Sequence, residues 1–358
     1  MTPAVATFLD EIELGAPKTF ERLTLWPLLQ KPKLATRDPV GAETRLSYRL
    51  LAEALEHGDV VVEEISDTGS VPNVRVRNLC DEALLVLFGE ELRGAKQNRI
   101  ANASFLIPPK GEIVIDVTCV EAGRWRSRPT GGASASPRFE GSGSVVSQSM
   151  RRQMSFDVAE SRAAGHGFRA DQSDVWNEVS HRLSESGTSS RSSAWSDYAA
   201  ARSERLTAAR AVFAPSGVGF VAAIDGEVVG MEVIGAPEVY ARSFTRLLDA
   251  YLIDAVEEGA DKSESKTADP TAFLAKVREA RTTSGPSLGL GEDLRLRSDS
   301  VEGAALVAGQ VVHLTAAPAQ VKKSRPTRRL SFDATADSVA AFDMTADVRR
   351  PRRSRDVA

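Results

Sequence analysis

The order of strand-like and helix-like segments along the 358 residues restricts the fold most strongly. Short alternating or apolar segments come first, helical segments fill the middle, and a hairpin, more helices and two closing strands follow. A parallel doubly wound sheet requires strands and helices to alternate regularly, and this order does not do so. The sequence therefore predicts an α+β fold in which helices pack on a mainly antiparallel or mixed sheet, within one large domain.

Strand segments in the first part of the chain are marked by alternation or by short apolar runs. Residues 47–56 (SYRLLAEALE) are typical of a short helix with Ser47 as its N-cap. The predicted strands cover residues 23–28, 59–65, 74–77, 83–88 and 113–117. The last three form the centre of the predicted sheet.

Two polar stretches interrupt the middle of the chain. Residues 127–144 are rich in Gly, Ser and Pro and predict a long flexible loop, and residues 184–193 predict a second one. Apolar residues recur every fourth position around them, as at Val146, Met150 and Met154. The sequence therefore predicts a helical region over 145–213, with its third helix starting near residue 195.

Asp225-Gly226 gives the clearest local prediction, because both residues tolerate the positive φ angles of a two-residue hairpin turn. A β-hairpin is expected over 218–233. The apolar stripe of residues 244–252 predicts a helix there. A second helix is expected to begin at Asp269-Pro270, because this pair is a favourable helix N-terminus. Strands at 304–307 and 311–314 complete the predicted domain, which covers residues 1–320.

Charge is distributed unevenly along the chain. Residues 321–358 hold ten Arg and Lys against five Asp, a charge of +5, which leaves the rest at −9 within the total of −4. We interpret 321–358 as a disordered Arg-rich tail that solubilises the chain, because aspartates separate its basic clusters. Nucleic-acid binding through this tail is the less favoured alternative.

Cysteine content and hydropathy predict the compartment. The sequence has no run of 18 apolar residues, and its first residues (MTPAVATFLDEIELG) are acidic where a secretory signal is basic. The two cysteines, Cys80 and Cys119, are too few for a disulfide scaffold. A cytoplasmic protein that does not bind a membrane is expected.

A first polar cluster, GEELRGAKQNR at 89–99, directly follows the apolar strand at 83–88. Its carboxylate, amide and guanidinium groups suit a polar, anionic small molecule, with Glu90 as a candidate acid or base. A charged turn exposed to water explains the same residues equally well. The candidate ligand-binding residues are Gln97, Asn98 and Arg99.

A second cluster, CVEAGRW at 119–125, follows the strand at 113–117 and is expected to converge with the first. Arg124 suits a phosphate or carboxylate, and Trp125 suits stacking on a base or sugar. Glu121 is a second candidate acid or base, unless an arginine pairs with it and keeps it ionised. Cys119 is a candidate nucleophile, although a small core residue is the favoured interpretation.

Other chemistries lack their motifs in this sequence. The four histidines are scattered without HExxH, and GxxxxGK[ST] does not occur, so neither a metal nor a nucleotide cofactor is expected. His313 is interpreted as a hydrogen-bonded, partly buried residue of an apolar strand. Trp176 is interpreted as a core residue.

The run FGEELRGAKQNRIANASFLIPP followed by VTCVEAGRW resembles the ADP-ribosylglycohydrolase-and-rhodanese-phosphatase-associated protein domain, a bacterial and archaeal family. The resemblance extends over about residues 10–316, through Gln172 and the closing strand. It implies a place in NAD and ADP-ribose metabolism and adds Gln172 as a ligand-binding residue. If the site is catalytic, the resemblance implies a hydrolase or transferase acting on an ADP-ribose-type or nucleotide substrate. Glu232 departs from the family pattern, where aspartate is expected.

A second hypothesis, from another class, assigns no reaction to these residues. In it, the polar clusters form a structural network of a non-enzymatic interaction module, and the basic tail binds a partner.

Overall fold

The computed structural model describes residues 2–32, 46–65, 72–124, 139–256 and 267–320. Contacts divide the chain into two units, Met1–Gln320 and Val321–Ala358. The Arg-rich tail is the second unit and lies outside the described residues, as does Trp125. The following description concerns the first unit.

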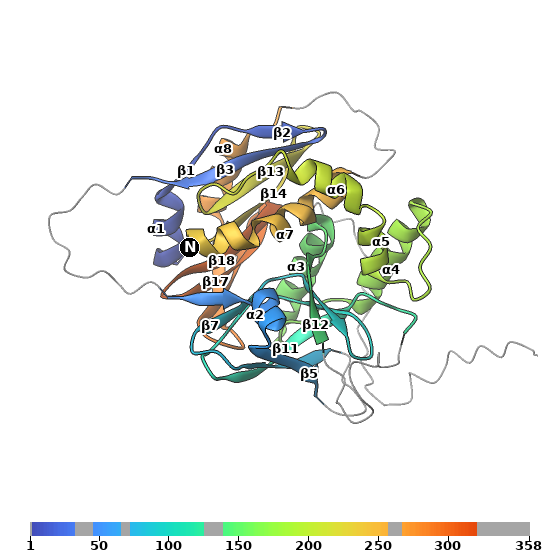
Figure 1. Ribbon diagram of the computed structural model, residues 1–358. Coiled ribbons are helices and arrows are strands. Elements are labelled where there is room, and N and C mark those ends of the chain that lie inside the picture. The colour runs from blue at the N-terminus through green and yellow to red at the C-terminus, as the bar shows by residue number, and fades with distance from the viewer. Residues whose placement is uncertain (1, 33–45, 66–71, 125–138, 257–266, 321–358) are drawn as a thin grey trace, which may run out of the picture. The chain divides into compact units, whose positions relative to one another are not determined.

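The largest sheet has nine strands and combines the two ends of the first unit (Figure 1). Its N-terminal strand β3 pairs antiparallel with β13, so the start of the chain lies beside a strand almost 200 residues later. The strands run in the order β1-β3-β13-β14-β18-β17-β16-β15, with β2 also paired to β3. Their bounds are β1 Ile12–Leu14, β2 Lys18–Phe20, β3 Leu23–Gln30, β13 Gly219–Ile224, β14 Glu227–Ile234, β15 Arg281–Pro286, β16 Glu292–Arg297, β17 Val301–Ala308 and β18 Gln310–Pro318.

Two smaller sheets come from the segment between β3 and the first long helix. A six-stranded sheet has the order β12-β8-β9-β11-β6-β5, and a three-stranded sheet has the order β10-β7-β4. Strand β4 pairs parallel with β7, whereas β10 pairs antiparallel with it. Their bounds are β4 Tyr48–Leu50, β5 Val60–Glu64, β6 Asn73–Asn78, β7 Ala83–Val86, β8 Glu90–Gly94, β9 Arg99–Ala101, β10 Phe105–Ile107, β11 Glu112–Cys119 and β12 Phe139–Val145.

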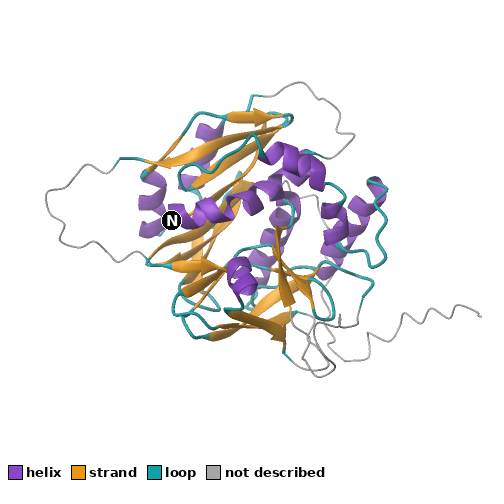
Figure 2. Ribbon diagram, viewed as in Figure 1, coloured by secondary structure: helices purple, strands orange, loops and turns teal. Residues whose placement is uncertain are grey.

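Helices cover both faces of the nine-stranded sheet (Figure 2). Alternation along β13 directs Phe220 to one face, against Phe244 and Tyr251 of α7, and Val221 to the other face, against α1 and α8. The helices are α1 Pro3–Asp10, α2 Leu51–His57, α3 Gln148–Ala163, α4 Gln172–Glu185, α5 Trp195–Ala200, α6 Ser203–Arg210, α7 Pro237–Ala255 and α8 Pro270–Glu279. The fold is therefore α+β with antiparallel and mixed sheets, as predicted.

Three local predictions are corrected by the structure. Residues 47–56 do not form one helix: Tyr48–Leu50 is strand β4, and α2 begins at Leu51 without a side-chain cap. The buried Tyr48 and Leu50 favour pairing with β7 over the helical propensity of the segment. The third helix expected near residue 195 is two short helices, α5 and α6.

The third correction concerns the loop predicted over 127–144. Residues 127–138 lie outside the described part, but Phe139–Val145 form strand β12 beside β8. Phe139 and Val145 are buried, and Gly141 passes so close to α2 that an added Cβ would lie 3.4 Å from the Cα of Ala52. Gly141 thus permits a close approach of strand β12 to α2.

Candidate functional site

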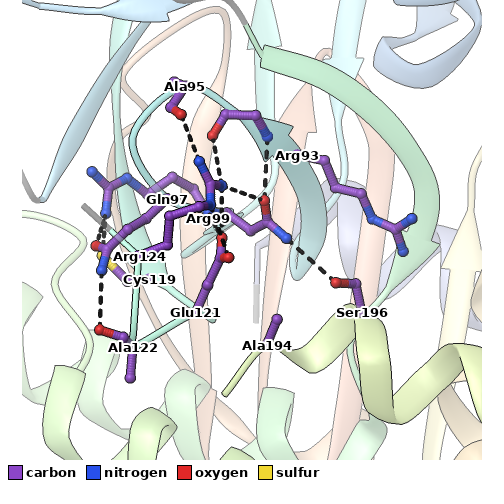
Figure 3. A network of polar contacts seen from close by, with 12 residues as sticks. Arg93, Ala95, Gln97, Arg99, Cys119, Glu121, Ala122, Arg124, Ala194 and Ser196 are labelled. Atoms are coloured by element: carbon purple, nitrogen blue, oxygen red, sulfur yellow. Dashed lines mark hydrogen bonds and ion pairs between the residues drawn. The ribbon is translucent and has the colours of Figure 1, made fainter. Parts of the chain in front are cut away.

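The two polar clusters of the sequence meet at one end of the six-stranded sheet (Figure 3). The turn after β8 and the turn after β11 are joined by direct hydrogen bonds between their side chains and backbones. We call this set the turn network. Its members are Gln97, Asn98, Arg99, Cys119, Glu121 and Arg124.

Arg124 holds the two turns together. Its Nε and Nη2 donate to the two carboxylate oxygens of Glu121 at 2.8 and 2.7 Å. Its Nη1 and Nη2 also donate to the carbonyl oxygens of Ala95 and Gly94, at 2.8 and 3.2 Å. Because Ala95 has a positive φ of 40°, this turn is a strained conformation that the arginine stabilises.

Glu121 is fully buried and ionised. One of its oxygens accepts the backbone N–H of Asn98 at 3.0 Å, and Ser192 also donates to the carboxylate. Burial raises the pKa of Glu121, but the hydrogen bonds from Arg124, Ser192 and Asn98 outweigh it and lower the pKa below its usual value. Glu121 therefore acts as an acceptor that fixes the turns, not as a group that exchanges protons near neutral pH.

Cys119 contacts Arg99, and both residues are completely buried. Burial raises the pKa of the Cys119 thiol to about 11, although the neighbouring Arg99 opposes this shift. Arg99 Nη1 also donates a hydrogen bond to Oε1 of Gln97 at 3.2 Å. The thiol is thus a neutral core group at neutral pH.

Cys119 is consequently expected to resist alkylation in the folded protein. After treatment with iodoacetamide at pH 8, peptide mass mapping should find Cys119 unmodified, and modified only when urea is added. Fast alkylation of Cys119 in the folded protein would restore the nucleophile hypothesis.

Of the three remaining predicted site residues, Gln172 contacts the turn network and Glu90 lies away from it. Gln172, the first residue of α4, uses both ends of its amide on the backbone of Cys119, at 2.8 Å each. Glu90 points to the opposite side of β8 from Glu91 and pairs with Arg246 of α7 at 3.4 Å. Burial raises the pKa of Glu90, although the charge of Arg246 opposes this shift, whereas the pKa of Glu121 is lowered. Trp125 lies outside the described residues.

An open hollow of about 810 Å³ adjoins the turn network. Its wall is the segment between α4 and α5, for which the sequence predicts a flexible loop. Ser192 of this wall accepts the backbone N–H of Gly123 at 2.8 Å, and an added Cβ on Gly123 would lie 3.0 Å from the Cα of Ser192. The lining residues are Ser186, Gly187, Thr188, Ser189, Arg191, Ser192, Asp197, Ala200 and Ala201.

A second polar network, which the sequence analysis does not predict, lies in the core of the first unit. We call it the central network, and its centre is the carboxylate of Glu232, which is fully buried. Arg151 of α3 pairs with Oε1 of Glu232 at 2.7 Å, and His313 lies 2.9 Å from Oε2. Its members are Ser104, Gln148, Arg151, Glu232, Tyr251, His313 and Thr315.

Charge keeps Glu232 ionised at this depth. Burial raises the pKa of Glu232, but the charge of Arg151 and the hydrogen bond from His313 lower it to about 2. A sequence signal for this network exists: Glu232, His313 and Thr315 are polar positions within apolar strands. Because Thr315 pairs with Glu232 across β14 and β18, alternation directs all three side chains to the face under α3 and α7.

Comparison with protein families adds one decisive match. Residues 11–317 match the family model of the ARG and Rhodanese-Phosphatase-superfamily-associated Protein domain. The chain belongs to this family. Characterised proteins and solved structures, compared separately, give no match.

The ARPP-1 domain, as the family is abbreviated, includes both polar networks and ends before the Arg-rich tail. Its name associates the family with ARG and rhodanese-phosphatase proteins. Within the described residues, no helix is long and apolar enough to cross a membrane, and no cluster of three His, Cys, Asp or Glu could hold a metal ion.

Proposed function

We propose that the chain binds an ADP-ribose-like, nucleotide-derived ligand in the hollow beside the turn network. The observation that carries this proposal is the double role of Ser192. It lines the hollow and, at the same time, contacts the Gly123 backbone and the Glu121 carboxylate. The turn network therefore fixes the position of the hollow's wall.

The chemistry of the hollow suits such a ligand. Hydroxyl groups of serine and threonine can bond to ribose hydroxyls, and the exposed Arg191 can pair with a phosphate. A volume of about 810 Å³ falls in the range of small-molecule sites, roughly 300–1,000 Å³.

The turn network supports binding rather than proton transfer in this proposal. Glu121 is ionised, and both of its oxygens accept hydrogen bonds from within the chain. Asn98 is likewise engaged, because its Oδ1 accepts from Gly94 and Arg124. A rigid wall lowers the entropy cost of binding, since few groups need to be ordered by the ligand.

Isothermal titration with ADP-ribose and with NAD tests the proposal. The wild type is expected to release heat on binding at least one of them, and Arg191→Ala is expected to weaken that binding by about tenfold, the loss of one charge-assisted hydrogen bond. Arg281→Ala is the matched control, because Arg281 is an exposed arginine on β15 and does not line the hollow.

A second candidate function is that of a non-enzymatic interaction module. The burial of Asn98, Arg99 and Glu121 favours it, because these side chains already have partners within the chain. The same titration separates the two candidates. No heat from the wild type with either ligand at millimolar concentration contradicts ligand binding and leaves a structural role for the network.

A further inference from the structure

The hollow beside the turn network is lined by two groups of opposite charge that do not pair with each other. Its wall is the segment that joins α4 to α5 (Figure 1) and the first residues after α5. Arg191 and Asp197 both line it, but no ion pair joins them, and Arg191 has no polar partner among the described residues. Separate positive and negative groups suit a ligand that has an anionic group at one end and hydrogen-bond donors at the other.

Local hydrogen bonds fix the carboxylate of Asp197 in this wall. The backbone N–H of Ala194 donates to Oγ of Ser190 at 3.0 Å, and the Ser190 hydroxyl donates to Oδ2 of Asp197 at 2.6 Å. Asp197 lies on α5, and the aromatic residues Trp195 and Tyr198 anchor this helix in the core. Oδ1 has no partner within the described part of the chain, so the oriented carboxylate can accept hydrogen bonds from a ligand.

The hydroxyl hydrogens of three wall residues are already used within the chain. Ser186 donates to the carbonyl oxygen of Arg182 at 2.7 Å, so Thr188, whose Oγ1 lies 2.8 Å from Oγ of Ser186, donates to Ser186. Ser192 donates to the carboxylate of Glu121. These hydroxyls can offer a ligand only their lone pairs, as Asp197 does. A ligand that matches this wall must therefore supply donors of its own, as the hydroxyls of a sugar do.

The described residues that line the hollow include no aromatic or large apolar side chain. Its apolar surface comes from Ala200 and Ala201. The aromatic rings of α5 face the core instead, because Trp195 and Tyr198 are each 1% exposed and their ring centres lie 5.8 and 5.7 Å from the guanidinium carbon of Arg182. Proteins commonly hold a nucleotide base by stacking it on an aromatic ring, and this wall has no such ring.

We propose that the hollow recognises a ribose phosphate and does not read the base attached to it. Arg191 pairs with the phosphate, and Asp197 accepts hydrogen bonds from the neighbouring ribose hydroxyls. A carboxylate also binds ribose hydroxyls in dinucleotide-binding folds. The inference rests on the proposed function, because it names the part of the nucleotide-derived ligand that the same hollow holds.

Isothermal titration with ribose 5-phosphate, AMP and UMP tests which part of the ligand is bound. The three dissociation constants are expected to agree within about threefold, because the part common to all three makes the contacts. 2′-Deoxy-AMP is expected to bind about tenfold more weakly than AMP, since it lacks one hydroxyl that donates to a charged acceptor.

Asp197→Ala separates the carboxylate from the rest of the wall. In this variant, AMP and 2′-deoxy-AMP should bind with equal affinity, because the group that distinguishes them is gone. Asp299→Ala is the matched control, since Asp299 is exposed and does not line the hollow. It should keep the difference of about tenfold between the two nucleotides. Thermal unfolding of both variants verifies that they fold.

Two results overturn the inference while leaving the proposed function standing, provided that ADP-ribose or NAD binds. One is AMP binding more than about tenfold more tightly than ribose 5-phosphate, and the other is AMP binding no more tightly than 2′-deoxy-AMP. If ribose 5-phosphate binds but neither ADP-ribose nor NAD does, the inference stands and the proposed function is wrong. Absence of heat from every ligand overturns both. If Asp197→Ala does not fold, the comparison of AMP with 2′-deoxy-AMP in the wild type decides the question.

Discussion

Replacing Arg151 with methionine is expected to lower the free energy of unfolding by about 3–5 kcal/mol, because the change leaves a buried charge without its partner. Arg151 and Glu232 are 1% and 0% exposed and lie 2.7 Å apart. The contacts of Tyr251, Thr315 and His313 with Glu232, at 3.1, 3.2 and 2.9 Å, remain, but none of them replaces the guanidinium of Arg151. Urea unfolding followed by circular dichroism measures the effect.

A surface ion pair provides the control for this prediction. Arg297 and Glu160 are 52% and 54% exposed, so Arg297→Met is expected to cost at most about 1 kcal/mol. The double variant of Arg151 and Glu232, with methionine at both positions, should recover part of the loss, since it leaves no buried charge. Equal losses from Arg151→Met and Arg297→Met would show that the buried pair does not stabilise the fold.

Glu121→Gln is expected to lower the melting temperature at pH 7, with a loss of about 1–3 kcal/mol. The amide keeps the shape of the side chain but has no charge, so the remaining hydrogen bond from Arg124 is weaker. Its NH2 group also replaces one of the two oxygens that accept from Arg124, which places a donor against a donor. The loss is smaller than for Arg151, because Arg124 is partly exposed and solvent screens the pair. Differential scanning calorimetry measures it, with the exposed Glu204→Gln as the control.

The pH dependence of this loss has a definite sign. The folded-state pKa of Glu121 is lower than the unfolded value of about 4.3, so its ionised form stabilises the folded state above that pH. The stabilisation is lost as the pH falls through the folded-state pKa. The difference between wild type and Glu121→Gln should therefore be full at pH 7 and shrink below about pH 4. A constant difference down to pH 3 contradicts the assignment.

Sequence alone predicted the elements whose signals are local. The turn of the β13–β14 hairpin is Asp225-Gly226, with φ of 51° and 76°, as the two residue types require. Helix α8 begins at Pro270, and the Asp269 side chain accepts the backbone N–H of Ala272 at 2.8 Å. In each case the physical cause lies within four residues of the chain, so no knowledge of the fold was needed.

The polar networks depend on contacts that no local pattern contains. Convergence of the turns after β8 and β11 was expected from their positions, but the depth of burial was not, because it depends on the segment around Ser192 covering them. For Glu232, the aspartate expected from the family drew attention to the position without indicating its partners. Arg151 lies on α3, 81 residues earlier in the chain than Glu232. The helical periodicity of that segment comes from its apolar residues, so it does not mark Arg151 as a partner.

The pairing of β3 with β13 has a consequence for synthesis on the ribosome. The strands of the six-stranded sheet lie within residues 60–145 and can assemble as soon as they emerge. Strand β3 can pair early with β1 and β2, but it waits for residues 219–224 before its other neighbour, β13, exists. During that interval the apolar side chains of Leu23, Leu25 and Leu28 lack later residues that share their core clusters, such as Phe220 and Val221. Nascent chains that contain β3 but not yet β13 are thus expected to be prone to aggregation and to capture by chaperones.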